Sequence, residues 1–151
     1  MDKVQQTIVM RSKFPDGTGT KKLRSGKYCA QASHASIAFL SHKFHNTVNN
    51  KISGINNLGE FYEEFIDTPK SLTDEEKIWI NEAFTKIVIY VETEQELLDI
   101  YNRAKDEELT VHLITDSGLT EFNGAPTNTC LAIGPHWKSK IDPITKDLRL
   151  F

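Results

Sequence analysis

The chain has 151 residues, 38% of them hydrophobic and 26% charged, which is typical of one soluble domain with a full core. No run approaches the ~20 apolar residues of a membrane span, and the opening stretch MDKVQQTIVMRS lacks the apolar core of a signal sequence. We therefore expect a single domain, residues 1–151, that is cytoplasmic and has no membrane partner.

The net charge of −3 hides an asymmetry between two parts of the chain. Residues 1–51 hold nine lysines and arginines against two aspartates, a balance of +7, and the remainder stands at −10. Four of the basic residues lie in one short segment: Lys21, Lys22, Arg24 and Lys27. A local basic face of this kind fits a phosphate backbone as its partner, although charges that are simply solvated remain the alternative.

The first third of the chain predicts a strand, a loop and a helix. Val4–Arg11 contains a short β-branched and apolar run, which favours a strand. Residues 12–25 predict a loop with a turn at Pro15-Asp16-Gly17. A helix is expected from about Lys27 to His45, because small and apolar residues recur along it.

Residues 46–85 form an insert between this helix and the next strand. We expect Asn46–Gly59, which is polar and rich in asparagine, to be irregular, and Glu60–Ile66 to form a short helix. Thr73 and Glu76 have the spacing of a capping box and predict a helix that ends near residue 84.

The second half alternates strands and helices. In Lys86–Val91, the residues that would face either side of a sheet are apolar from position 87 onward, which is typical of a central strand covered on both faces. Thr93 and Glu96 form a second capping box and begin a helix that reaches about residue 108. The remaining expected elements are strands at 111–115 and 129–133, a helical turn at 139–142 and an extended tail at 148–151.

This order of elements predicts an α/β protein. We expect a small mixed, mostly parallel four-stranded sheet with helices on both faces, in which the last two strands can pair antiparallel.

Two kinds of site are excluded by spacing. The segment GTGTKK lacks the spacing of a phosphate-binding P-loop, so we do not expect a nucleoside triphosphate site. Cys29 and Cys130 have no nearby cysteine or histidine at metal-ligand spacing, so we expect buried, reduced cysteines and no metal site.

Lys27 stands at the start of the first predicted helix. A lysine is unfavourable there, because the helix dipole makes that end positive. An anion bound by the ammonium and the free backbone N–H groups would explain the choice, whereas a surface lysine without a role is the alternative.

Asp116 and Thr120 lie in the loop after the strand at 111–115. In open α/β sheets, ligands gather beyond the carboxyl ends of the strands, so Lys27 and Asp116 meet if the two preceding strands are parallel near neighbours. Such a group could bind an oxyanion through Lys27 and orient water through Asp116 and Thr120. A turn or cap role for Asp116 remains the alternative.

The chain also resembles a known family. GKYCAQASHA, ITDSGLTEF and TNTCLAIGP are similar, in this order, to the three signature blocks of the type II peptidyl-tRNA hydrolases of archaea and eukaryotes. ETEQELLDIYNRAKDEEL and the closing KIDPITKDLRLF are also similar. The resemblance implies a mixed four-stranded sheet between helices, a homodimer, and metal-independent hydrolysis, with no cofactor, of the ester that joins a peptide to the 3′ ribose of tRNA.

The positions that match the functional pattern of the family are Lys27, Gln31, His34, Asp116, Thr120 and Thr129. We assign Lys27, Asp116 and Thr120 to catalysis. Gln31, Thr129 and the basic residues Lys21, Lys22 and Arg24 are assigned to substrate and tRNA binding. Thr129 can instead be a backbone cap, and Asp116 can act as a base or orient Lys27.

His34 is two helical turns beyond Lys27, ~10 Å along the helix axis, so we interpret it as a structural histidine hydrogen-bonded near the sheet. Two positions depart from the pattern of the family. Leu119 stands where arginine is frequent, and Pro126 stands where glycine is usual, which predicts a stiffer loop.

The sequence therefore predicts a peptidyl-tRNA hydrolase. A non-catalytic tRNA- or RNA-binding module on the same fold is the alternative.

Overall fold

The computed structural model describes residues 1–49, 51–55, 58–65, 71–82 and 84–151. The strands of the main sheet are β1 (Val4–Arg11), β6 (Lys86–Val91), β7 (Val111–Asp116), β8 (Thr127–Trp137) and β9 (Arg149–Leu150). The helices are α1 (Ser25–Asn49), α2 (Asp74–Asn81), α3 (Glu94–Asp106) and α4 (Lys138–Thr145). Two small hairpins are formed by β2 (Phe14–Pro15) with β3 (Thr20–Lys21) and by β4 (Lys51–Ile55) with β5 (Phe61–Phe65).

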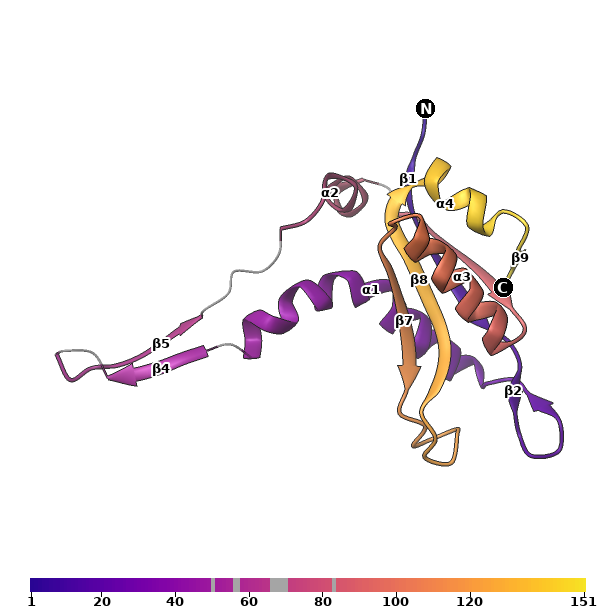
Figure 1. The fold of residues 1–151 in the computed structure, drawn as a ribbon, viewed down its shortest axis with the longest axis horizontal. Helices are drawn as coiled ribbons and strands as arrows, with labels where there is room; N and C mark the ends of the chain where they lie inside the picture. The colour runs from indigo at the N-terminus through magenta and orange to yellow at the C-terminus, as the bar shows by residue number, and fades with distance from the viewer. Residues whose placement is uncertain (50, 56–57, 66–70, 83) are drawn as a thin grey trace.

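The predicted α/β class is confirmed, but the sheet differs from the expected one. It has five strands in the order β7-β8-β1-β6-β9 rather than four (Figure 1). Within the described residues β1 and β6 are the parallel pair, and the other three pairs are antiparallel, so "mostly parallel" was wrong. Strands β1, β6 and β7 do point the same way, as crossover connections require, but β8 returns between β7 and β1 and separates them.

The sheet is covered on both faces. Along β1, Ile8 and Met10 face a cluster with residues of α1, whereas Val9 faces the cluster built with α3 and α4. Neighbouring residues of β8 divide in the same way, because successive side chains of a strand point to opposite faces. All of β1 is buried, and the strand has the bounds predicted from the sequence.

The two predicted capping boxes are present. The Thr73 hydroxyl accepts a hydrogen bond from the Glu76 N–H and caps α2, and Thr93 does the same with Glu96 at the start of α3. Each glutamate accepts in return from the backbone N–H of the threonine, so two otherwise free donors are satisfied at each helix start.

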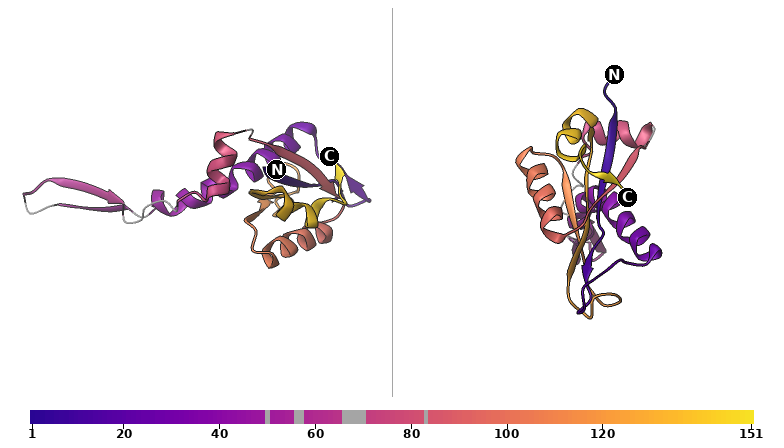
Figure 2. Two further views of the ribbon diagram at one scale, coloured as in Figure 1. Left: turned by 90° about the horizontal axis from the view of Figure 1, so that it is seen from above. Right: turned by 90° about the vertical axis from the view of Figure 1, so that its right-hand side faces the viewer.

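The insert is where the expected elements fail. The helix predicted to end at residue 45 continues to Asn49, because extending a helix that already exists needs no new nucleus. The irregular stretch and short helix predicted over 46–66 are replaced by the end of α1 and the β4–β5 hairpin, which extends away from the sheet (Figures 1 and 2). Isoleucine and aromatic residues favour strands in 51–65, and paired strands override the weak helical pattern. Residues 50, 56–57, 66–70 and 83 of the predicted insert lie outside the described residues.

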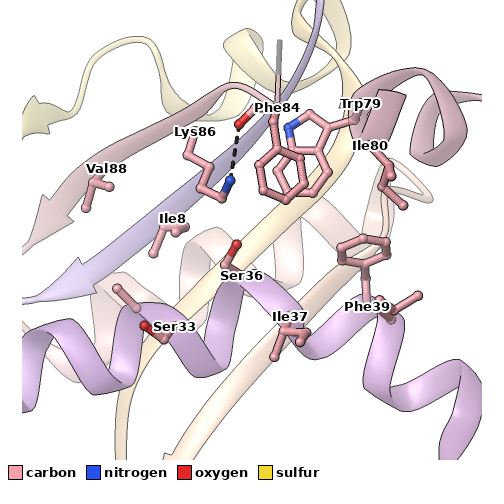
Figure 3. Close-up of a pocket in the computed structure, with 12 residues that line it drawn as sticks. Ile8, Ser33, Ser36, Ile37, Phe39, Trp79, Ile80, Phe84, Lys86 and Val88 are labelled. Atoms are coloured by element: carbon pink, nitrogen blue, oxygen red, sulfur yellow. Dashed lines mark hydrogen bonds between the residues drawn. The ribbon is translucent and has the colours of Figure 1, made fainter. Parts of the chain in front are cut away.

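An apolar groove of about 570 Å³ runs between α1, α2 and the face of β6 that α1 leaves uncovered (Figure 3). Ile37 of α1, 56% exposed, and Phe84, 50% exposed, lie along it, and Lys86 crosses it with its ammonium 3.4 Å from the centre of the Phe84 ring. Among the described residues, no helix has the length and apolar character that crossing a membrane requires.

Candidate active site

The topology brings the start of α1 to the end of β7. Since β1 and β7 point the same way with β8 between them, their carboxyl ends lie at the same edge of the sheet. The chain leaves β1, forms the β2–β3 hairpin and enters α1 at this edge, while the loop after β7 carries Asp116 to Thr120 across it. The condition set by the sequence, two parallel near neighbours, is thus met although they are not adjacent.

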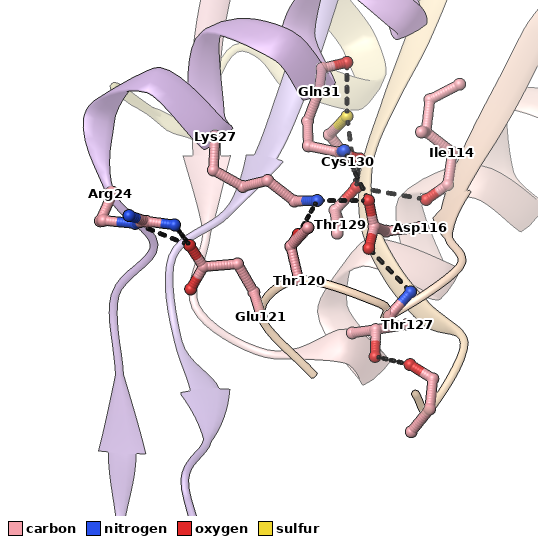
Figure 4. A network of polar contacts seen from close by, with 12 residues as sticks. Arg24, Lys27, Gln31, Ile114, Asp116, Thr120, Glu121, Thr127, Thr129 and Cys130 are labelled. Atoms are coloured by element: carbon pink, nitrogen blue, oxygen red, sulfur yellow. Dashed lines mark hydrogen bonds and ion pairs between the residues drawn. The ribbon is translucent and has the colours of Figure 1, made fainter. Parts of the chain in front are cut away.

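A compact polar group forms between these two segments (Figure 4). Lys27 Nζ donates to Asp116 Oδ2 at 2.6 Å and to Thr120 Oγ1 at 3.1 Å. The side chains of Lys27 and Asp116 are 17% and 11% exposed, so the pair is shielded but still within reach of a ligand. Since an ammonium has three N–H donors, these two bonds leave one for a substrate oxygen.

Gln31 and Thr129 form a second layer beneath this group. Gln31 Nε2 donates to Asp116 Oδ2 at 3.0 Å, and the buried Thr129 hydroxyl donates to Gln31 Oε1 at 2.5 Å. Thr129 is the third residue of β8 rather than its first, and its hydroxyl is committed to Gln31. This chain of bonds fixes the carboxylate of Asp116 from below, so Gln31 and Thr129 are buried supports of the group.

The loop from Asp116 to Thr127 is held by its own backbone. The Gly118 N–H donates to Asp116 Oδ1 at 2.8 Å, and Gly118 has a φ of +82°. A Cβ at this position would lie 2.1 Å from the Ala125 carbonyl oxygen, so only glycine fits. Leu119, where the family often has arginine, is 82% exposed beside Thr120.

The Asp116 carboxyl is held in its charged form. Burial alone would raise its pKa, but hydrogen bonds from Lys27, the Gly118 N–H and Gln31, together with the charge of Lys27, lower the pKa below its ordinary value. Asp116 is therefore ionised at neutral pH, and its two oxygens are directed by three donors.

This lowered pKa predicts how the stability contribution of Asp116 depends on pH. As the pH falls, the unfolded chain, in which the pKa of an aspartate is about 3.9, takes up the proton before the folded chain does. The contribution is therefore complete above that pH and is lost as the pH falls through the folded pKa. We expect the free energy of unfolding lost in Asp116→Asn to be constant near neutral pH and to shrink below about pH 4. Urea unfolding of both proteins from pH 7 to pH 3 measures it, and a loss that already shrinks between pH 7 and pH 5 would contradict the assignment.

The basic residues surround the group but differ in their contacts. Arg24, with an 83% exposed side chain, pairs with Glu121 at 2.8 Å, and Lys21 donates to the Glu121 carbonyl at 2.8 Å. Lys22 is exposed and has no polar partner among the described residues. The contacts of Glu121 with Arg24 and Lys21 were not predicted. An acidic residue in a loop that faces a basic segment is the sequence feature that indicates such contacts.

His34 and Cys29 are not where they were expected. Both are exposed, and His34 makes no hydrogen bond within the described part of the chain, so its interpretation as a structural histidine hydrogen-bonded near the sheet was wrong. Cys130 is buried as expected, and burial raises the pKa of its thiol to about 12, which keeps it unreactive. The described residues hold no group of three or more His, Cys, Asp and Glu side chains suited to a metal ion.

The chain is similar to known proteins over most of its length. The family model described as peptidyl-tRNA hydrolase PTH2 matches residues 4–151. Proteins named peptidyl-tRNA hydrolase are similar to the chain: one from Methanothermobacter thermautotrophicus is 34% identical over 149 residues, 97% of this chain and 99% of that protein. One from Nanoarchaeum equitans is 32% identical over 148 residues, 98% of this chain and 99% of that protein. One from Methanocaldococcus jannaschii is 40% identical over 88 residues, which make up 76% of that protein but 58% of this chain.

Proposed function

We propose a mechanism for this chain, which belongs to the peptidyl-tRNA hydrolase PTH2 family, as the match over residues 4–151 establishes. The chain is a peptidyl-tRNA hydrolase, an enzyme that cleaves the ester between a peptide and the 3′ ribose of tRNA. We propose that the Lys27–Asp116–Thr120 group carries out this cleavage.

One observation supports the assignment most directly: the shielded Lys27–Asp116–Thr120 group at the carboxyl edge of the sheet. Ester hydrolysis needs a positioned water and a donor for the negative charge that develops on the carbonyl oxygen. The third N–H of Lys27 is suited to donate to that oxygen, because its other two are directed by Asp116 and Thr120.

Asp116 acts in this mechanism mainly by positioning Lys27. Its lowered pKa makes it a weak base, but it keeps the carboxylate charged and able to accept a hydrogen bond from the attacking water. Thr120 accepts from Lys27, so its own O–H is free to donate to the water or to the departing 3′ oxygen. Water then adds to the carbonyl carbon, the bond between that carbon and the 3′ oxygen of the ribose breaks, and the 3′ oxygen leaves with the proton that the water loses.

The mechanism is tested by incubating the purified protein with a peptidyl-tRNA or an N-blocked aminoacyl-tRNA in the presence of EDTA. We expect release of free tRNA and peptide at an unchanged rate, because the proposed chemistry needs no metal. Cleavage that EDTA abolishes would overturn the metal-independent mechanism, and tight binding without cleavage would support the non-catalytic tRNA-binding module instead.

The tRNA is proposed to lie on the basic segment, supported by the exposed positions of Lys22 and Arg24. Changing Lys21, Lys22 and Arg24 to alanine together should raise KM. It should also lower the slope of log KM against log salt concentration by about two, since each phosphate contact contributes to that slope. Steady-state kinetics at a series of salt concentrations measure this. The control is Lys105, Lys138 and Lys140 changed to alanine on α3 and α4, across the sheet. Equal slopes for the two triple variants would refute the basic face.

We also propose one domain that forms a homodimer and works in the cytoplasm, where translation supplies its substrate. The resemblance to the family and the groove with exposed Ile37 and Phe84 support dimerisation. If the groove is the interface, Ile37→Glu should convert a dimer into a monomer in light scattering after size exclusion, because a charge would be buried. Leu119→Glu, at a residue that is also apolar and exposed but lies outside the groove, is the control, and a dimer that survives Ile37→Glu would exclude the groove as interface.

A further inference from the structure

A second pocket, of about 340 Å³, lies beside the start of α1 and is separate from the Lys27–Asp116 group. Three aromatic rings line it: Tyr28 from α1, Tyr90 from β6 and Phe151, the residue after β9. Two lysines, Lys13 and Lys22, also line it. None of these five residues has a role in the hydrolysis described above beyond the phosphate contacts assigned to Lys22.

The pocket is fixed by the edge of the sheet. Strand β9 pairs with β6, and the Phe151 N–H donates to the Val88 carbonyl at 3.0 Å. The Phe151 ring stands edge-on to Tyr28 at 4.9 Å and to Tyr90 at 6.1 Å between ring centres. Tyr28 is almost fully buried, whereas Phe151 remains 52% exposed, so a large aromatic ring is held firmly and offered to solvent.

Two lysines and one glutamate line the pocket around this ring. Lys13 pairs with Glu92 at 2.6 Å, but Lys22 makes no hydrogen bond or ion pair with any other residue that the structure describes. An accessible aromatic ring next to an unpaired cation is the combination that single-stranded nucleic acid uses, with a base stacked on the ring and a phosphate beside the cation. A purely apolar ligand, such as a side chain of the peptide, would not need the cation.

The pocket lies next to the ester site along the chain. Tyr28 follows Lys27 directly, and successive residues of a helix point about 100° apart, so the two side chains serve neighbouring faces of the same turn. Lys22 belongs to the basic segment that joins both. In Figure 2, β9 and the β2–β3 hairpin lie at the same end of the molecule, away from the β4–β5 hairpin.

We propose that this pocket binds an unpaired base of the tRNA 3′ end, stacked on Phe151, with the adjoining phosphate on Lys22. The proposal rests on the function above, because it takes the ester to lie at Lys27. It adds a place where the enzyme recognises the single-stranded end of its substrate rather than the ester itself.

The test uses binding of a short oligoribonucleotide that ends in CCA, and matched oligonucleotides in which one of the three terminal bases is replaced by an abasic site. With the wild-type protein, one of these abasic oligonucleotides should bind about tenfold more weakly, the scale of one stacked base. With Phe151→Leu, which keeps an apolar side chain against Tyr28 and Tyr90 but removes the ring, the intact oligonucleotide should lose about the same factor and the abasic one should lose no more. Leu150→Ala, also exposed on β9 but outside the pocket, should bind as the wild type does.

Three outcomes would overturn the proposal. Equal affinity of the wild type for all the oligonucleotides would show that no base is stacked, and unchanged binding by Phe151→Leu would show that the base lies elsewhere. If Phe151→Leu instead changes the rate only for peptides of particular sequence, the pocket binds the peptide. The proposed function is judged separately, by hydrolysis of peptidyl-tRNA by the wild type.

Discussion

Replacing Asp116 by asparagine is expected to lower kcat ~10²-fold or more, with little change in shape. The substitution removes the charge that directs Lys27 at 2.6 Å, so the ammonium is no longer held toward the developing negative charge, and the loss of one such donor usually lowers kcat by ~10²–10³. Lys27→Ala should lower kcat comparably, since it removes the donor for the developing negative charge. Single-turnover hydrolysis of an N-blocked aminoacyl-tRNA measures the chemical step.

The double variant distinguishes a working pair from two independent residues. If Lys27 and Asp116 act as a unit, the double variant should be scarcely slower than either single one, whereas independent effects would multiply. His34→Ala serves as control, and because His34 is exposed we now expect it to keep both stability and turnover. If Asp116→Asn kept near-normal kcat while His34→Ala abolished it in a folded protein, the histidine would be the base.

Changing Lys43 to methionine is expected to destabilise the protein by about 3–5 kcal/mol, the usual loss when one partner of a buried ion pair is removed. Lys43 Nζ donates to Glu76 Oε2 at 2.6 Å, and Glu76 is 1% exposed. The other carboxylate oxygen of Glu76 has no hydrogen-bond partner among the described residues. Without Lys43, the carboxylate would keep one hydrogen-bond donor among the described residues, the Thr73 N–H at the start of α2. The loss would be a large part of the ~5–15 kcal/mol typical of a whole domain.

Urea unfolding of the Lys43→Met variant and the wild type measures this loss. The control is Lys77→Met, whose partner Asp74 is 89% exposed, and we expect it to cost no more than about 1 kcal/mol. Two variants of equal stability would mean that the Lys43–Glu76 pair does not anchor α2 to α1.

The parts of the fold that were predictable are those with a strong local signal. Val4–Arg11 contains a short apolar run and Lys86–Val91 is apolar from residue 87 onward, and Thr73 and Thr93 begin helices through side-chain contacts three residues away. Sheet order has no such signal, because the pairing of β8 between β7 and β1 depends on contacts between residues far apart in the chain. The β4–β5 hairpin was missed because isolated pairs of short strands resemble polar loops and weak helices in sequence.

The candidate site was easier to predict than the topology around it. Lys27 and Asp116 were predicted to meet because each lies beyond the carboxyl end of a strand. This prediction needed β1 and β7 to point the same way but not to be adjacent. Burial was harder to foresee. His34 lies three residues after Gln31 and points ~60° away from it around the axis of α1, which is enough to take it from the buried side of the helix to the exposed one.

The length of α1 sets a distance within the molecule. Its 25 residues span ~37 Å, with Lys27 near one end and the β4–β5 hairpin joined at the other. A stiff helix of this length works as a spacer, so the hairpin cannot touch an ester bound at Lys27. The end of such a spacer is a place where a chain tolerates added residues. We therefore expect changes within the hairpin to leave the contacts of Lys27 in place.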